Sequence, residues 1–470
     1  MIAGLKPYPE YKDSGVPWLG QIPARWDVRR MKLLLREVDS RSSTGKEQLL
    51  RVSQYTGVTQ RKAIDGTDAP DTRAASLVGY KRVTPDDLVV NIMLAWNGSM
   101  GVSRYDGIAS PAYCVYRFKD GARPWYYHEL LRLPLYKGRI KTASTGVVES
   151  RLRLYSDDLG RIEAIQPPTE DQDAIVRFID YANGRLERAI RAKRKVITLL
   201  HEQKQAIIHR AVTRGLDPTV PLKPSGIPWL GDIPKHWELT KLRRVCFYQE
   251  GPGLRTWQFT ERGVQVICVT NITVNGVNLG AYGRFISRDE YAAKYRHFTV
   301  ERGDVMLASS GNSWGKIAEF TGSETVILNT STIRLNPTRF GKVSTPFLKL
   351  VLAAEYVRLQ LQSLLTGSCQ PNFGPSHLNR VVVTFPPETA TQNAIVSTVS
   401  SESAPLDTTI ARLDREIELL REYRTRLVAD VVTGKLDVRP AARQLPEKSA
   451  PGTVPAPEEL PEEAEAEETD

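Results

Sequence analysis

The chain contains the same sequence segments twice. Residues 14–26 read SGVPWLGQIPARW and residues 225–237 read SGIPWLGDIPKHW, so nine of thirteen positions are identical. A second pair, PPTEDQDAIV at 167–176 and PPETATQNAIV at 386–396, differs by one inserted residue. Both halves then close on similar segments, VTRGLD at 212–217 and VTGKLD at 432–437. Because repeats of this kind mark repeated structural units, we predict the order module, helix, module, helix and tail.

The segments that follow both Pro-Pro pairs have the pattern of long helices. Apolar residues recur there at alternating steps of three and four, which predicts coiled-coil packing. In the first segment they are Ala182, Leu186, Ala189, Val196, Leu200 and Ile207, and in the second Leu406, Ile410, Leu413, Ile417, Leu420, Leu427 and Val431. At 1.5 Å per residue, about 43 residues span roughly 65 Å. Two copies in one chain are expected to pair antiparallel, with the modules at opposite ends.

The two modules between these segments have a mixed pattern. Runs at 87–92 and 304–308 predict strands, glycine-rich turns follow at 97–101 and 310–315, and residues 346–365 have a helical pattern. The predicted fold class is two α/β (α+β) domains per chain, separated by two long antiparallel coiled-coil helices and related by an internal pseudo-two-fold repeat. The predicted boundaries are 1–166 for the first module, 167–217 for the first helix, 218–385 for the second module, 386–438 for the second helix and 439–470 for the tail.

The charge is distributed unevenly along the chain. The formal net charge is +10, but residues 445–470 contain nine acidic residues and one lysine, so residues 1–444 carry +18. A basic body is typical of nucleic-acid-binding proteins, although charge for solubility explains it as well. The Pro-, Ala- and Glu-rich tail is predicted to be disordered. It is interpreted as a solubilising tail, with an autoinhibitory DNA mimic as the alternative.

The sequence lacks the patterns of membrane, disulfide and catalytic proteins. No apolar run approaches the roughly 20 residues of a membrane span, and the N-terminus lacks a signal peptide, so we expect a cytoplasmic protein. The cysteines at 114, 246, 268 and 369 are too scattered for a disulfide framework or a zinc site, and we predict reduced structural thiols. The Pro-Pro pairs lack the flanks of an amino-methyltransferase loop.

Two further sequence features imitate catalytic sites. Residues 311–317 (GNSWGKI) are one residue short of a phosphate-binding loop, and Ile317 stands where a magnesium-ligating hydroxyl is required. Asp86, Asp87 and Asp304 could belong to a nuclease, but caps at the beginnings of strands explain them better. We therefore expect no catalytic residue, no metal and no cofactor site.

Four loops contain side chains suited to reading base edges. Asn and Gln can pair with adenine and Arg and Lys with guanine, while small hydroxyls can contact either. The candidate DNA contacts are Gln54, Tyr55, Thr59, Gln60, Arg61, Lys62, Trp96, Asn97, Ser99, Ser309, Ser310, Asn312, Trp314, Lys316, Gln370 and Asn372. Taken singly, each is also explained as a turn former or a solvated side chain.

These features together resemble the specificity subunit of type I restriction–modification systems. The resemblance covers residues 8–436, from the twin tryptophan motifs and the Pro-Pro helix beginnings to TGSCQPNF at 366–373 and LNTSTIRL at 328–335. In the first module SPAY at 110–113 stands where the second has NTST at 329–332. Two features depart from the pattern: the acidic tail after residue 443, and TGVVE at 145–149, which lacks the QPN run.

The resemblance implies a non-catalytic subunit in which two target-recognition domains each read half of a split sequence in double-stranded DNA. Its coiled coil would set the spacing and bind two methyltransferase subunits, which carry S-adenosylmethionine and methylate adenine. Motor-nuclease subunits would cleave DNA with ATP and Mg. Candidates for the coiled coil and its partner contacts are Gln172, Leu186, Leu200, Ile207, Gln392, Ile410, Ile417 and Leu427.

Two other classes of function stay open at this point. An autonomous DNA-modifying enzyme with divergent motifs would turn over DNA as the purified chain alone. A coiled-coil scaffold whose modules bind protein would show no sequence-selective retention on duplex DNA.

Overall fold

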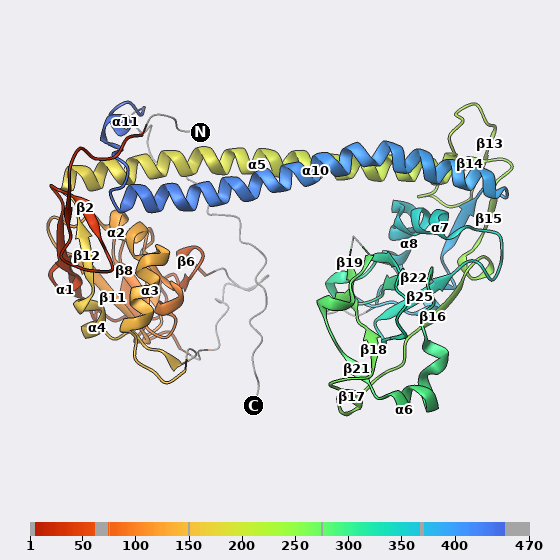
Figure 1. Cartoon of the computed structure of the whole chain (residues 1–470), viewed down its shortest axis with the longest axis horizontal. Coiled ribbons are helices and arrows are strands. Elements are labelled where there is room, and N and C mark those ends of the chain that lie inside the picture. Colours follow the sequence, from red (N-terminus) through yellow and green to blue (C-terminus); the bar gives the residue numbers. More distant parts are fainter. Residues whose placement is uncertain are drawn as a thin grey trace. The chain divides into compact units, whose positions relative to one another are not determined.

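The computed structural model describes residues 5–61, 74, 76–148, 151–273, 276–366 and 371–446. They fall into two compact units, Met1–Ala192 with Glu416–Asp470 (unit 1) and Lys193–Arg415 (unit 2). The two longest helices, α5 (Thr169–Arg214) and α10 (Thr389–Val432), contribute to both units (Figure 1). The predicted boundaries between modules and helices therefore do not coincide with the boundaries between the compact units.

Unit 1 is built around a four-stranded antiparallel sheet in the order β4–β11–β8–β9. Its strands are β4 (Leu35–Glu37), β11 (Tyr113–Phe118), β8 (Leu88–Asn91) and β9 (Met100–Val102). The helices of the module are α1 (Met31–Leu34), α2 (Pro124–Leu131), α3 (Pro134–Ala143) and α4 (Ser156–Arg161). The strand pairs are β1 (Tyr11–Asp13) with β2 (Gln21–Pro23), β3 (Asp27–Arg30) with β12 (Glu163–Gln166), β5 (Leu50–Ser53) with β6 (Gly57–Gln60), and β7 (Lys81–Val83) with β10 (Gly107–Ala109).

Unit 2 repeats this sheet in the order β16–β25–β22–β23. Its strands are β16 (Phe247–Glu250), β25 (Thr332–Asn336), β22 (Val305–Ala308) and β23 (Ile317–Glu319), and its helices are α7 (Thr345–Ala353), α8 (Glu355–Leu364) and α9 (Pro375–Leu378). The pairs β13 (Leu222–Pro224) with β14 (Asp232–Pro234) and β15 (Glu238–Lys241) with β26 (Val382–Phe385) repeat β1–β2 and β3–β12. The identical strand order confirms the predicted internal repeat.

Unit 2 also contains a second four-stranded sheet in the order β17–β21–β18–β24. Its strands are β17 (Phe259–Thr260), β21 (Phe285–Ile286), β18 (Val264–Ile267) and β24 (Val326–Leu328). Along the chain, the hairpin of β19 (Ile272–Thr273) with β20 (Gly276–Val277) follows β18. Helix α6 (Arg288–Glu290) continues into a π-helical turn, Tyr291–Tyr295. The two modules thus share a scaffold and differ in what is inserted into it.

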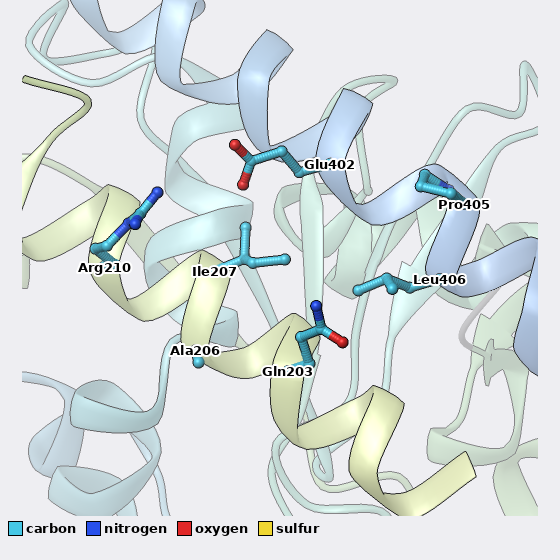
Figure 2. A pocket seen from close by; sticks show the side chains of 7 residues that line it. All are labelled: Gln203, Ala206, Ile207, Arg210, Glu402, Pro405 and Leu406. Carbon is cyan, nitrogen blue, oxygen red and sulfur yellow. The ribbon is translucent and has the colours of Figure 1, made fainter. Parts of the chain in front are cut away.

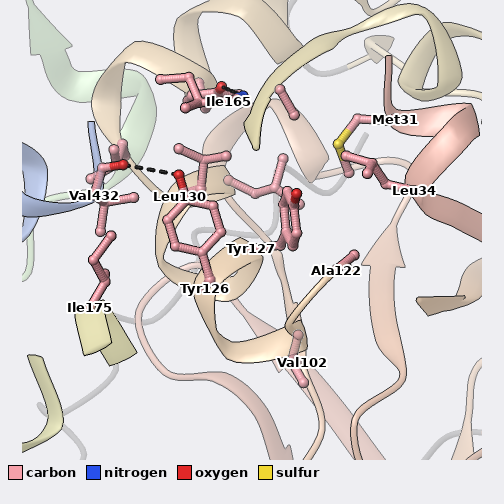
Figure 3. Close-up of a cluster of buried hydrophobic side chains, with 14 of the residues drawn as sticks. Met31, Leu34, Val102, Ala122, Tyr126, Tyr127, Leu130, Ile165, Ile175 and Val432 are labelled. Atoms are coloured by element: carbon pink, nitrogen blue, oxygen red, sulfur yellow. Dashed lines mark hydrogen bonds between the residues drawn. The ribbon is translucent and has the colours of Figure 1, made fainter. Parts of the chain in front are cut away.

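Each unit joins the beginning of one long helix to the end of the other. In unit 1, Ile175 and Phe178 of α5 pack with Val431 and Val432 of α10, and the Tyr126 hydroxyl donates to the Val432 carbonyl at 3.0 Å (Figure 3). In unit 2, the reverse ends meet: Ile208 and Val212 of α5 share a core with Ile395 and Val399 of α10. The two helices are therefore antiparallel within each unit, and the predicted fold class is confirmed.

The repeated glycines end the helices against the repeated tryptophans. Gly434 and Gly215 have φ angles of 81° and 76°, and a Cβ there would lie 2.7 Å from Trp26 and 3.2 Å from Trp237, respectively. Trp26 and Trp237 are both buried. The two repeated sequence signals are thus explained by one contact, in which a left-handed glycine allows the helix end to approach an indole.

Two local predictions need correction. Residues 346–365, predicted to be helical throughout, form two helices that are interrupted at Ala354. On α5 the strict heptad assigns Val196 to the buried stripe, but it is 44% exposed, whereas Ile190 and Ile208 are buried. An α-helix has 3.6 residues per turn, so a straight helix drifts away from a strict heptad stripe.

The predicted disordered tail begins later than residue 439. Helix α11 (Arg439–Arg443) follows α10, Ala442 is part of the core of unit 1, and Arg439 forms a bidentate ion pair with Asp437. The Asp437 amide donates to the Lys6 carbonyl at 2.8 Å, so the two ends of the described chain meet in unit 1. The rest of the predicted tail, residues 447–470, lies outside the described residues.

Candidate nucleic-acid interface

A buried glutamine fixes the beginning of each long helix to its module. The Gln172 side chain donates to the Gly121 and Pro167 carbonyls at 3.0 and 2.7 Å and accepts from the Arg123 amide at 2.8 Å. Gln392 makes the same three bonds, to the Lys342 and Pro386 carbonyls at 2.8 and 3.0 Å and from the Ser344 amide at 2.8 Å. Both side chains are fully buried. They therefore act inside their own units and are not available to a partner subunit, contrary to their assignment as partner contacts.

The predicted loops of the first module meet through one arginine. The Arg132 guanidinium donates to the Gln54 and Tyr55 carbonyls at 3.0 and 2.7 Å in the β5–β6 turn, and to the Met100 carbonyl at 2.8 Å. Longer contacts reach the carbonyls of Ser53 and Gly98 at 3.5 and 3.4 Å. Since one planar guanidinium joins both loops, Arg132 fixes their relative position.

His128, one turn before Arg132, supports the same region. Its Nδ1 accepts from the Val102 amide at 3.0 Å. Burial, together with the guanidinium groups of Arg132 and Arg104, lowers the pKa of His128 to about 3. The imidazole is therefore neutral at physiological pH and serves as a hydrogen-bond acceptor.

The predicted loops of the second module also come together. The Gly311 amide donates to the Pro371 carbonyl at 3.0 Å, and the Phe373 amide donates to the Ser309 carbonyl at 3.1 Å. Trp314 packs edge-on against Phe373, with ring centroids 6.5 Å apart, and the Arg358 guanidinium lies 5.7 Å from its ring centre. The segments 309–316 and 371–373 therefore form one surface.

This arrangement is repeated in the first module with different side chains. Thr366 and Asn372 exchange two backbone hydrogen bonds, and so do Thr145 and Arg153. The next amide, that of Leu154, donates to the Ile92 carbonyl at 2.9 Å, as Phe373 does to Ser309. Arg153 thus stands where the second module has Asn372. Arg153 could not be recognised from the sequence because TGVVE at 145–149 lacks the QPN run. The Thr-Gly pair that both modules share does mark the position.

The candidate DNA contacts differ in exposure. Tyr55 is 74% exposed. The other exposed candidates are Gln60, Asn312, Lys316 and Asn372, and the half-buried ones are Gln54, Thr59, Arg61, Trp96, Asn97, Ser310 and Trp314. Lys62 and Gln370 lie outside the described residues.

Two serines among the candidates are buried. Ser99 is 3% exposed and its hydroxyl donates to Asn97 Oδ1 at 2.8 Å, so it stabilises the turn. Ser309 has no exposed surface. Ser99 directly precedes β9, and Ser309 directly follows β22. Because both are buried, their hydroxyls are not available to DNA.

Two lysines on α3, Lys137 and Lys141, also lie beside the predicted loop at 96–99, although they are not among the predicted contacts. Lys137 covers Gly98 closely enough that a Cβ there would lie 2.4 Å from its Cε, and burial followed by the charge of Arg132 lowers the pKa of Lys137. One turn later, the Lys141 amine lies 5.6 Å from the Trp96 ring centre. The positive charge next to the loop therefore comes from a helix, where no loop motif marks it.

The carboxylates that imitate a nuclease have structural roles. Asp87 accepts from the Thr84 amide at 2.9 Å and pairs with Arg117 at 3.0 Å. Asp304 likewise accepts from the Glu301 amide at 2.9 Å and pairs with Arg334 at 3.4 Å. Both begin a central strand, as the cap interpretation predicts. Among the residues that the structure describes, no group of three or more His, Cys, Asp or Glu side chains could hold a metal ion.

The remaining coiled-coil candidates lie on the facing sides of α5 and α10 in each unit. Ile410, Ile417 and Leu427 are buried. Leu186, Leu200 and Ile207 are half-buried. In unit 2 a groove of about 550 Å³ runs between the helices, lined by Gln203, Ala206, Ile207, Arg210, Glu402, Pro405 and Leu406 (Figure 2).

Comparison with known proteins agrees with this geometry. The sequence model of the type I restriction modification DNA specificity domain matches residues 234–419. The specificity subunit of type I restriction enzyme MjaVIII from Methanocaldococcus jannaschii is 24% identical over 371 residues, which cover 77% of this chain and 83% of that protein. Residues 234–419 therefore carry a type I restriction–modification DNA specificity domain, and the chain is similar to type I specificity subunits over most of its length.

The fold of this chain is also found in solved structures. A chain from a study of complex assembly and conformational transition of the type I R-M system has a TM-score of 0.61 and 14% identity, and the match covers 88% of this chain and 99% of that one. The HsdS subunit from Thermoanaerobacter tengcongensis has a TM-score of 0.42 and 15% identity, with 88% and 98% covered. The first likeness supports the fold, and the second is too distant to add to it. Within the described part of the chain, no helix is both long and apolar enough to span a membrane.

Proposed function

We propose that this chain is the specificity subunit of a type I restriction–modification complex and reads a bipartite, gapped target in double-stranded DNA, one half-site per module. The observation that carries the proposal is the repeated sheet, whose equivalent loops present different side chains. Arg153 in one module stands for Asn372 in the other, and both belong to the same two-bond backbone bridge. A scaffold duplicated with divergent loops fits two recognition events of the same kind on different sequences.

The chemistry of the loops fits this task. Arg and Lys neutralise phosphates, which supplies affinity that falls steeply with salt. Asn and Gln pair with base edges, and each bidentate pair contributes roughly 1–3 kcal/mol of discrimination. The exposed Asn312, Lys316 and Asn372 are the proposed base and phosphate contacts of the second module, and Tyr55, Gln60 and Arg153 those of the first.

The proposed partners follow from the family. Two methyltransferase subunits would bind along α5 and α10 and methylate adenine with S-adenosylmethionine, and motor-nuclease subunits would use ATP and Mg for restriction. The groove lined by Ile207 and Leu406 offers apolar surface for such a contact. The chain itself is proposed to be non-catalytic, to hold no cofactor and to work in the cytoplasm. Helix length would set the gap between half-sites, so lengthening both helices by equal insertions would lengthen the gap.

The test is methylation-sensitive sequencing of the host genome with and without the gene. Loss of one gapped motif with modified adenine on both strands is the expected result. Exchange of residues 309–316 and 371–373 for those of a relative should then change one half of the motif only. An unchanged pattern of methylation, or turnover of DNA by the purified chain alone, would overturn the proposal.

A further inference from the structure

An exposed tryptophan lies outside all four predicted loops. Trp257 is 78% exposed and lies in the 3₁₀ turn Thr256–Gln258, which directly precedes β17. Indole combines a large apolar ring with a polar N–H group, and tryptophan is enriched at binding surfaces for that reason.

The loop that presents Trp257 is firmly held. The Gly251 amide donates to the Thr332 carbonyl at 3.2 Å, and the Thr330 hydroxyl donates to the Pro252 carbonyl at 3.0 Å. Behind the indole, the buried Gln258 accepts from the Arg255 amide at 2.8 Å. The loop is therefore ordered before any partner arrives, which reduces the entropy lost on binding.

The far side of Gln258 is held by the helical segment after β21. Its amide nitrogen donates to Glu290 Oε1 at 2.6 Å and to the Tyr295 hydroxyl at 2.9 Å. Gln258 points inward with all its polar groups bonded, while its neighbour Trp257 points outward. The hydrogen bonds of Gln258 therefore hold the 3₁₀ turn in a conformation that leaves the indole at the surface.

The loop is continuous with the predicted DNA-reading surface of the second module. Residues 329–332 connect the two: Thr330 bonds to Pro252 on one side, and the Ser331 carbonyl accepts from the Ser309 amide at 3.0 Å on the other. Ser309 begins the segment that contacts Pro371 and Phe373. Hydrogen bonds therefore connect Phe373, through Ser309 and residues 330–331, to Pro252 in the tryptophan loop.

The surroundings of the loop suit a polyanion. Arg255 is exposed. The exposed Arg284 guanidinium lies 4.7 Å from the Phe259 ring centre and 5.3 Å from that of Tyr282. These contacts orient the guanidinium while leaving it at the surface, next to the strand that follows Trp257.

We propose that residues 251–258 are a further DNA contact of the second module, in which the Trp257 indole packs on the sugars or bases of the half-site. Arg255 and Arg284 pair with the neighbouring phosphates. The inference rests on the proposed function and extends it to the loop that precedes β17 of the second sheet in unit 2. Aromatic contacts with bases are sequence-tolerant, so this surface contributes affinity and register more than base identity.

The test uses the subunit assembled with its methyltransferase partner and a duplex that carries the gapped motif found by methylation mapping. Trp257→Ala is expected to weaken binding about 10-fold or more, and Trp257→Phe, which keeps a ring, by much less. Trp229→Ala is the matched control, because Trp229 is 46% exposed but belongs to the tryptophan motif and not to this surface. Arg255→Gln should reduce the slope of log affinity against log salt by about 1.

The outcomes separate this inference from the function on which it rests. If the wild-type complex binds the motif selectively and Trp257→Ala binds it equally well, the loop is not a DNA contact. Equal weakening by Trp229→Ala and Trp257→Ala would also overturn it. If the wild-type complex shows no preference for the motif over a scrambled duplex, the proposed function itself fails.

Discussion

Replacement of Gln392 by Leu tests whether the buried glutamines fix the helices to their modules. Gln392 makes hydrogen bonds of 2.8, 2.8 and 3.0 Å from a fully buried side chain. Leucine has a similar volume but leaves the Ser344 amide and two carbonyls without their partner. A hydrogen bond contributes about 1 kcal/mol net, and an abandoned buried group costs about 1–3 kcal/mol. Because Lys342 and Ser344 reach solvent in part, we expect a total loss of about 3 kcal/mol.

The assay is urea denaturation of the full-length chain, combined with hydrogen exchange at the Ser344 amide. The Gln392→Leu variant should unfold at lower urea, and the Ser344 amide should exchange faster than in the wild type. Gln203→Leu is the matched control, because Gln203 is exposed on α5, and it should change stability by less than about 0.5 kcal/mol. A Gln392→Leu protein as stable as that control would refute the reasoning. The equivalent change at Gln172 should have an effect of the same size in unit 1.

Three further predictions concern the modules and the helices. Arg132→Met removes the guanidinium that joins the two loops of the first module. In a binding assay, discrimination between sequences at one half-site should fall about 10-fold or more, while the other half-site keeps its selectivity. Retained selectivity at both half-sites would contradict this role of Arg132. His128 is neutral in the folded protein but titrates near pH 6.5 when unfolded, so below pH 6.5 protons bind the unfolded state in preference. The free energy of unfolding should therefore fall below pH 6.5, by about 2 kcal/mol at pH 5. Denaturation of His128→Asn should show a shallower pH dependence. Pro405 lies inside α10, where it removes a helical hydrogen bond, so Pro405→Ala should raise the thermal midpoint, and a lower midpoint would show that the surrounding packing requires the proline.

The architecture could be predicted from the sequence because its signals are local or repeated. The tryptophan motifs, the Pro-Pro helix beginnings and the glycines at the helix ends each mark one contact, and that contact is made twice. The strands at 88–91 and 305–308 are short buried runs that begin after a capping aspartate. Such features depend on a few neighbouring residues and are visible without tertiary structure.

The candidate interface could be predicted only in part, because exposure and neighbourhood depend on tertiary contacts. Ser99 and Ser309 have the right chemistry, but the turn places their hydroxyls inside. Arg132 lies in the turn after α2 and Lys137 lies on α3, and both reach the loops only in the folded chain. The Trp257 loop lies outside the segments that the two halves repeat, so comparison of the two halves could not reveal it.

The meeting of the chain's ends in unit 1 has a consequence for the covalent order of the polypeptide. In unit 2, Asp217 leads through a continuous segment into β13 at Leu222, five positions later. In unit 1, the equivalent Asp437 bonds instead to Lys6, and β1 begins at Tyr11, again five positions later. The order of modules and helices along the polypeptide is thus cyclic with one break, and that break could equally lie after Asp217. A gene rearranged in that way, with residue 437 joined to residue 6 through a short linker, would encode the contacts of the repeated segments in a different order but would give up those of α11, and either half could come first in evolution or in the laboratory.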